Sequence, residues 1–89
     1  MRDAVKQFAV AMEDKLQAKD DERGVDGWLY PPCDIHYLIV RLEDEVRELK
    51  AAFEDCDPGM VKQETVDIGN FAMMIFDRLT KKGENHGSV

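Results

Sequence analysis

The sequence is poor in positive charge and in cysteine, and it has no long apolar run. Twelve Lys and Arg stand against nineteen Asp and Glu, so the net charge is −7. Proteins that bind nucleic-acid polymers or anionic membrane surfaces depend on clusters of Lys and Arg, and this acidic balance argues against both partners. The longest apolar run, residues 71–76, is too short to span a bilayer. Because the first residues also lack the apolar core of a signal peptide, we expect a cytoplasmic protein.

Cysteine and chain length set two further limits. Cys33 and Cys56 cannot make a disulfide framework and do not have the spacing of a zinc motif, so we expect two reduced thiols, with a single bridge between them as the alternative. With 44% apolar residues in 89, the chain is long enough for one globular domain, expected over residues 1–82, with a flexible tail over residues 83–89. A domain of this size buries only a modest fraction of its chain surface, so it needs disulfides, a metal, a partner subunit or very efficient packing.

Apolar periodicity predicts three helices. In the first, about residues 3–19, apolar side chains recur at helical spacing at Val5, Phe8, Met12 and Leu16. Residues 20–32 break the pattern with two glycines and a Pro-Pro pair, which is typical of a loop. No segment has the pattern of a strand, so the predicted fold class is all-α.

The second and third helices have recognisable start signals. Asp34 is placed to cap the second helix, which we expect to run to about Glu54. Asp57, followed by proline, is placed to cap the third, which we expect to reach about Lys81 and to end at Gly83. Apolar side chains recur on one face of the second helix at Ile35, Leu38, Leu42, Val46, Leu49 and Phe53.

The third helix is apolar over more than half of its circumference. Its apolar residues are Val61, Ile68, Phe71, Ala72, Met73, Met74, Ile75, Phe76 and Leu79. Such a helix needs more than one neighbour, and two other short helices hardly supply enough cover. We therefore expect a helical bundle with three main helices per chain that is completed by oligomerisation. The alternative is a compact monomeric three-helix bundle.

Four carboxylates have a helical phase that turns them toward the interior. Glu45 falls inside the apolar stripe of the second helix, and Glu48 lies one turn along at its margin. On the third helix, Glu64 and Asp67 fall between the directions of large apolar side chains. Two helices thus each aim an i, i+3 pair of carboxylates inward.

Buried carboxylates must become protonated or find positive charge. Arg41, Arg47 and Lys50 lie mostly toward the polar side of the second helix, so a divalent cation is the simpler answer. All-oxygen ligands select Mg²⁺ or Mn²⁺, whereas zinc prefers His or Cys. Mg²⁺ held by carboxylates often completes its shell with substrate phosphates, which points to a phosphate-ester or nucleotide site. The alternative is a solvated helix face, or salt bridges at the edge of the bundle.

Two acidic motifs occur in order on the second and third predicted helices. The first is Asp44-Glu45-x-x-Glu48, within DEVRE, and the second is Glu64-x-x-Asp67, within QETVDIGNFAMMI. Together they resemble the MazG-like, all-α nucleoside triphosphate pyrophosphohydrolases, which carry E-E-x-x-E on one helix and E-x-x-D on the next. The pairs KL at 15–16 and GW at 27–28 are similar to short phage and bacterial members.

The resemblance implies hydrolysis of a nucleoside triphosphate to its monophosphate and pyrophosphate. Glu45, Glu48, Glu64 and Asp67 would hold Mg²⁺, and either Asp44 or Glu48 would act as general base. Family members assemble as homodimers or dimers of dimers. The rival hypothesis is a non-catalytic dimeric helical module that keeps the bundle and serves interaction or regulation.

Three further residues are candidates for contact with the nucleotide. Trp28, in the loop, either stacks on a base or closes the end of the core. Lys15 either reaches a phosphate or is an ordinary surface lysine. Asn70, three residues past Asp67, either bonds a phosphate or sugar or makes a plain helix contact. His36 is expected to be structural or exposed rather than a metal ligand.

Overall fold

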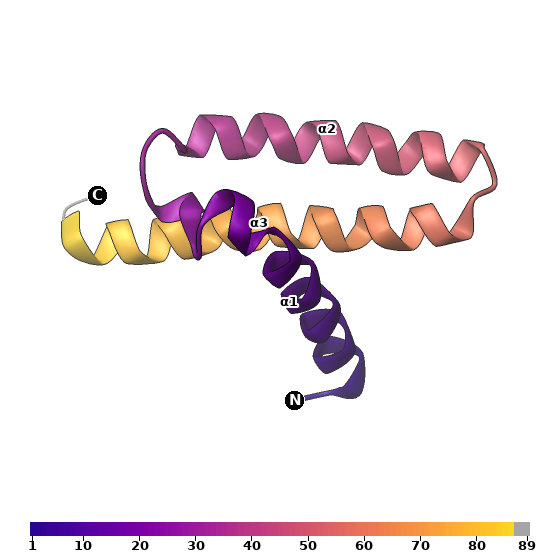
Figure 1. Ribbon diagram of the computed structural model, residues 1–89, viewed down its shortest axis with the longest axis horizontal. Coiled ribbons are helices and arrows are strands. Elements are labelled where there is room, and N and C mark those ends of the chain that lie inside the picture. Colours follow the sequence, from indigo (N-terminus) through magenta and orange to yellow (C-terminus); the bar gives the residue numbers. More distant parts are fainter. Residues whose placement is uncertain (87–89) are drawn as a thin grey trace.

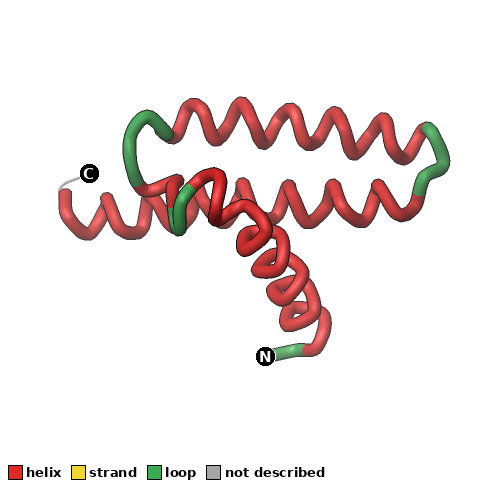
Figure 2. Tube along the Cα trace, in the orientation of Figure 1, coloured by secondary structure: helices red, strands yellow, loops and turns green. Residues whose placement is uncertain are grey.

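The chain folds into three α-helices and one short 3₁₀ helix. In the computed structural model, which describes residues 1–86, α1 spans Asp3–Arg23, η1 Gly27–Leu29, α2 Ile35–Glu54 and α3 Pro58–His86. Figure 2 shows these helices joined by short loops, and the described residues contain no strand. The predicted all-α class is therefore confirmed. None of the helices in this part of the chain is both long and apolar enough to cross a bilayer.

Both predicted capping acids are found at helix starts. The backbone N–H of Tyr37 donates to Asp34 Oδ1 at 2.8 Å. The backbone N–H of Met60 donates to Asp57 Oδ1 at 3.1 Å. Each bond satisfies an N–H group that has no partner within its own helix, so the starts of α2 and α3 are confirmed.

Two helix ends differ from the prediction. α1 continues one turn beyond residue 19 to Arg23 and ends at Gly24, whose φ of 78° suits glycine. The extra turn consists of charged residues, which carry no apolar periodicity although they are compatible with a helix. α3 continues through Gly83 to His86, so the expectation that Gly83 ends it is wrong. A single glycine costs a helix only about 1 kcal/mol. Residues 87–89 of the predicted tail lie outside the described residues.

α2 and α3 form an antiparallel hairpin, and α1 crosses α3 and projects away from the pair (Figure 1). Among residues 1–81, the buried apolar residues all come from the hairpin and are Leu38, Ala52, Val66 and Phe71. α1 buries no residue fully and packs chiefly on α3. The crossing is close at Gly69, where an added Cβ would lie 2.6 Å from the ring of Phe8. The three helices therefore do not close into a tight bundle within one chain.

Large apolar side chains remain exposed on the hairpin. Val46 and Phe53, which the apolar stripe of α2 placed with the core, are exposed, and Phe53 keeps 73% of its surface. On α3, Phe76 is also 73% exposed although both other helices contact α3. The apolar surface predicted for α3 is thus only partly covered by the neighbours that this chain supplies.

Candidate functional site

Three of the four predicted carboxylates converge between α2 and α3. Glu45 and Glu48 lie one turn apart on α2, and Glu64 faces them from α3. One oxygen from each carboxylate lies within 4.8 Å of the others. Glu45 and Glu64 are 6% and 7% exposed, whereas Glu48 is exposed to solvent. We refer to Glu45, Glu48 and Glu64 as the carboxylate trio.

The trio concentrates negative charge that is only partly compensated. Burial, followed by the hydrogen bond and negative charge of Glu64, raises the pKa of Glu45 from its ordinary 4.5 to about 7. The negative charge of Asp67 acts in the same direction, and Arg41 opposes it. Glu64 Oε2 is buried and has no hydrogen-bond partner. A buried carboxylate oxygen without a donor is costly, so this oxygen marks a position where positive charge would be stabilising.

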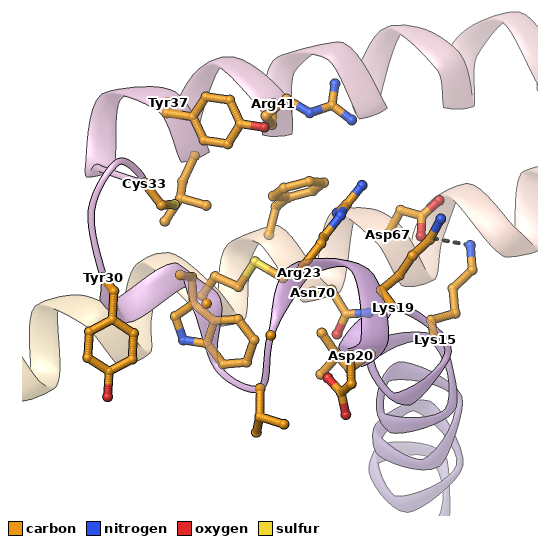
Figure 3. Close-up of a pocket in the computed structure, with 18 of the residues that line it drawn as sticks. Lys15, Lys19, Asp20, Arg23, Tyr30, Cys33, Tyr37, Arg41, Asp67 and Asn70 are labelled. Atoms are coloured by element: carbon orange, nitrogen blue, oxygen red, sulfur yellow. Dashed lines mark hydrogen bonds and ion pairs between the residues drawn. The ribbon is translucent and has the colours of Figure 1, made fainter.

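Asp67, the fourth predicted ligand, stands beside the trio. It follows Glu64 by one turn on α3, but its carboxylate faces α1, where Oδ1 accepts a hydrogen bond from Lys15 Nζ at 2.7 Å. Figure 3 shows this contact as a dashed line at the side of the cavity described below. Lys15 therefore lies against a predicted metal ligand.

Arg41 was expected on the polar side of its helix, and the structure places it at the site. Its Nη1 donates to Asp44 and its Nη2 to Glu45, both at 3.1 Å. Its guanidinium also lies over the ring of Phe71, 5.3 Å from the ring centre. The long side chain reaches the carboxylate one turn ahead on α2, which phase angles measured at Cα do not capture. Asp44 also accepts a hydrogen bond from Arg47, so its carboxylate is bound by two arginines.

A cavity of about 1150 Å³ opens beside the carboxylates (Figure 3). Its walls come from the second half of α1, the loop before α2, the start of α2 and the middle of α3. All three predicted nucleotide contacts, Lys15, Trp28 and Asn70, line it together with Glu45 and Asp67. The volume is slightly above the range of about 300–1000 Å³ that is usual for ligand pockets. The fold thus brings the three predicted substrate contacts together with two of the predicted metal ligands, whereas Glu48 and Glu64 do not line the cavity.

The cavity wall carries four basic residues and three acidic ones, although the chain as a whole is acidic. Lys15, Lys19 and Arg23 follow one another at four-residue intervals on α1, so they share a face, and Arg41 adds a fourth cation from α2. The sequence interpretation missed Lys19, Arg23 and Arg41. The four-residue spacing could have revealed the first two, but the predicted end of the helix at residue 19 left Arg23 outside it.

The loop that carries Trp28 is tied to α3. Trp28 Nε1 donates to Asp77 Oδ2 at 3.0 Å, and its carbonyl oxygen accepts from Arg78 Nη1 at 2.9 Å. Arg78 Nη1 also donates to the carbonyl oxygen of Cys33. The hydrogen bonds from Lys81 and Trp28 lower the pKa of Asp77. Local sequence patterns carry no signal for these contacts, because they join residues some fifty positions apart.

Asn70 combines a helix contact with an unused acceptor. Its Nδ2 donates to the carbonyl oxygen of Met12 at 3.3 Å, which ties α3 to α1. Its Oδ1 is buried without a hydrogen-bond partner, in a residue that is 5% exposed. Such an acceptor is normally satisfied by a donor, which a ligand in the cavity could provide.

Of the cysteines and histidines in question, Cys33 lines the cavity, whereas Cys56 and His36 do not. Cys33 and Cys56 are free and lie just before and just after α2, whose 20 residues span about 30 Å. Burial raises the pKa of the Cys33 thiol. His36 is exposed at the start of α2.

Chemically, the site sets carboxylates that lack full compensation beside a cavity whose wall holds four cations, one indole and a residue with a buried, partnerless amide oxygen. No family model matches the chain, and no curated protein or solved structure matches it either.

Proposed function

We propose that the protein is a Mg²⁺-dependent nucleoside triphosphate pyrophosphohydrolase of the MazG-like type. It would cleave an NTP or dNTP to the monophosphate and pyrophosphate. The observation that carries the proposal is the buried, partnerless Glu64 Oε2 within a carboxylate trio, of which Glu45 lines a cavity that also holds four cations.

The donor atoms suit the cation. They are all carboxylate oxygens, which Mg²⁺ and Mn²⁺ prefer, and those of the trio lie within 4.8 Å of one another. Glu45, Glu48 and Glu64 would hold the ion, with Asp67 one turn further along α3. When bound, Mg²⁺ neutralises phosphate charge and lowers the pKa of the attacking water.

The other roles fall to the residues of the cavity wall. The cations from α1 and α2 bind phosphate oxygens, and Trp28 offers its ring to the base. Asn70 Oδ1 accepts a hydrogen bond from the sugar or the base. With one oxygen holding the ion, Glu48 would keep its other oxygen to accept the proton of the water, whereas both oxygens of Asp44 are engaged by Arg41 and Arg47. Glu48 is exposed, so water reaches it.

The proposal includes a second copy of the chain. Exposed Phe53, Phe76 and Leu79 on the hairpin, with Val5 and Val10 on α1, leave apolar surface that a homodimer or a dimer of dimers would cover. Light scattering at micromolar concentration tests this, because a monomeric mass would contradict it.

A substrate screen with product identification tests the activity. Each of the common NTPs and dNTPs is incubated with protein and Mg²⁺, and products are separated to distinguish monophosphate plus pyrophosphate from diphosphate plus phosphate. Glu64→Gln should abolish turnover, because it removes the charge of the buried ligand. Glu43→Gln, an equal charge change at an exposed position of α2, should retain it. Absence of pyrophosphate release from every nucleotide would contradict the proposal.

The rival function is a dimeric interaction module without turnover. It is favoured by α1, which buries no residue fully and projects from the hairpin with Val5 and Val10 exposed (Figure 1). This hypothesis predicts a dimer that cleaves no nucleotide and whose melting temperature is unchanged by Mg²⁺. A rise in melting temperature with Mg²⁺ would favour the enzyme, since a bound ion stabilises the folded state.

A further inference from the structure

Two basic side chains form ion pairs with carboxylates of the proposed metal site. Lys15 Nζ lies 2.7 Å from Asp67 Oδ1, and Arg41 Nη2 lies 3.1 Å from Glu45 Oε1. Lys15 comes from α1 and Arg41 from α2, and Figure 3 shows the two side chains at different edges of the cavity. Each cation therefore competes for the carboxylate that a metal ion would use.

The same two side chains also line the cavity. Lys15 and Arg41 are only half-buried, so their charged groups remain accessible from the cavity. Arg41 has five N–H donors and shares its guanidinium with Asp44 and the ring of Phe71, so it can lose Glu45 without losing its position. Both cations thus contact a site carboxylate and also line the cavity in which phosphates would lie.

We propose that Lys15 and Arg41 exchange partners between the carboxylates and the substrate. This inference rests on the function proposed above. In the metal-free protein they neutralise Asp67 and Glu45, as the structure shows. When a divalent cation takes these carboxylates, the two side chains are released and bind the triphosphate. The bound ion then repels their positive charge and the phosphate oxygens attract it. Both forces therefore move the two side chains from the carboxylates toward the triphosphate.

The exchange couples the two ligands through the protein. Metal binding requires the basic groups to leave, and the triphosphate stabilises them once they have left. Each ligand therefore strengthens binding of the other, as linkage requires. Glu64, whose Oε2 has no partner, is the position at which the ion gains contact without displacing a side chain.

Removing Lys15 should shift the two affinities in opposite directions. Lys15→Met frees Asp67, so Mn²⁺ should bind about three- to fivefold more tightly, as expected for loss of a partly exposed ion pair. The same variant should bind inorganic triphosphate about tenfold more weakly in the presence of saturating Mg²⁺, because a phosphate ligand is gone. A merely structural role for Lys15 would weaken both.

The matched control is Lys19→Met. Lys19 lies one turn further along α1 and also lines the cavity, but its ion pair is with Glu22, at 3.6 Å, rather than with a site carboxylate. Lys19→Met removes the same charge as Lys15→Met without freeing a site carboxylate. It therefore measures how much the loss of one positive charge on α1 alone changes the affinity for the metal ion. Mn²⁺ affinity is followed by the EPR signal of the free ion, and triphosphate affinity by titration calorimetry.

The outcomes separate this inference from the proposed function. The exchange is supported if Lys15→Met binds Mn²⁺ more tightly than Lys19→Met does and also binds triphosphate more weakly than wild type does. Equal Mn²⁺ affinities in the two variants, or weaker binding in Lys15→Met, overturn it while the metal site stands. If wild type binds no Mn²⁺ at millimolar concentration, the metal site itself is wrong and the exchange falls with it. Lys15→Gln repeats the test if the Met variant does not fold.

Discussion

Replacing Glu45 by glutamine should remove a large part of the pH dependence of stability in the metal-free protein. Glu45 is 6% exposed, and burial together with Glu64 raises its pKa to about 7, against an ordinary value of 4.5. The folded state therefore holds the proton more tightly than the unfolded chain does. The stabilisation that the folded state gains from protonated Glu45 is fully present below about pH 4.5 and is lost as the pH rises through about 7. Glutamine has a similar shape and does not titrate in this range.

The size of the effect follows from the pKa difference. At about 1.4 kcal/mol per pH unit, the difference between 4.5 and about 7 corresponds to about 3 kcal/mol. Wild type loses this stabilisation as the pH rises and Glu45→Gln does not. The free energy of unfolding of Glu45→Gln minus that of wild type should therefore rise by about 3 kcal/mol between low pH and about pH 8. The Arg41 pair is already included, since it lowers the pKa of Glu45 in the folded state.

Chemical denaturation in the presence of EDTA measures this difference. Unfolding is followed by the fluorescence of Trp28, which is the single tryptophan, at a fixed protomer concentration, because an assembly would make stability concentration-dependent. Glu43→Gln is the control and should run parallel to wild type at every pH. The reasoning is refuted if the free-energy difference between Glu45→Gln and wild type changes by less than about 1 kcal/mol from about pH 4.5 to about pH 8.

Three further predictions concern the core, the exposed apolar face and the thiols. Leu38 is 1% exposed, so Leu38→Ala should lower the free energy of unfolding by about 2–5 kcal/mol in chemical denaturation, and a loss below about 1 kcal/mol would contradict its place in the core. Phe53→Ser should shift the mass in light scattering toward the monomer, because the side chain is 73% exposed on the proposed contact face; an unchanged mass would show that this face is not used. At mildly alkaline pH, Cys56 should react faster with Ellman's reagent than Cys33, whose pKa is raised by burial, as single Cys→Ser variants would show. Equal rates would argue against that burial.

Helical periodicity and capping chemistry are local, so the sequence alone was enough to predict the all-α class, the starts of α2 and α3 at Asp34 and Asp57, and the inward phase of Glu45 and Glu64. Helix ends were less readable. The charged last turn of α1 has no apolar pattern, and Gly83 lies inside α3 rather than after it.

Tertiary structure decided what these elements meet. The cavity, the pairing of Lys15 with Asp67 and the ties from Asp77 and Arg78 to the Trp28 loop all join residues about fifty positions apart. Arg41 lies at the site because its long side chain reaches Glu45, although the position of its Cα on the helix faces the polar side. Local patterns describe which face of a helix is apolar, but the angle at which α1 crosses α3 determines which charges share a cavity. The inward carboxylates were therefore predictable, and the cations that compensate them were not.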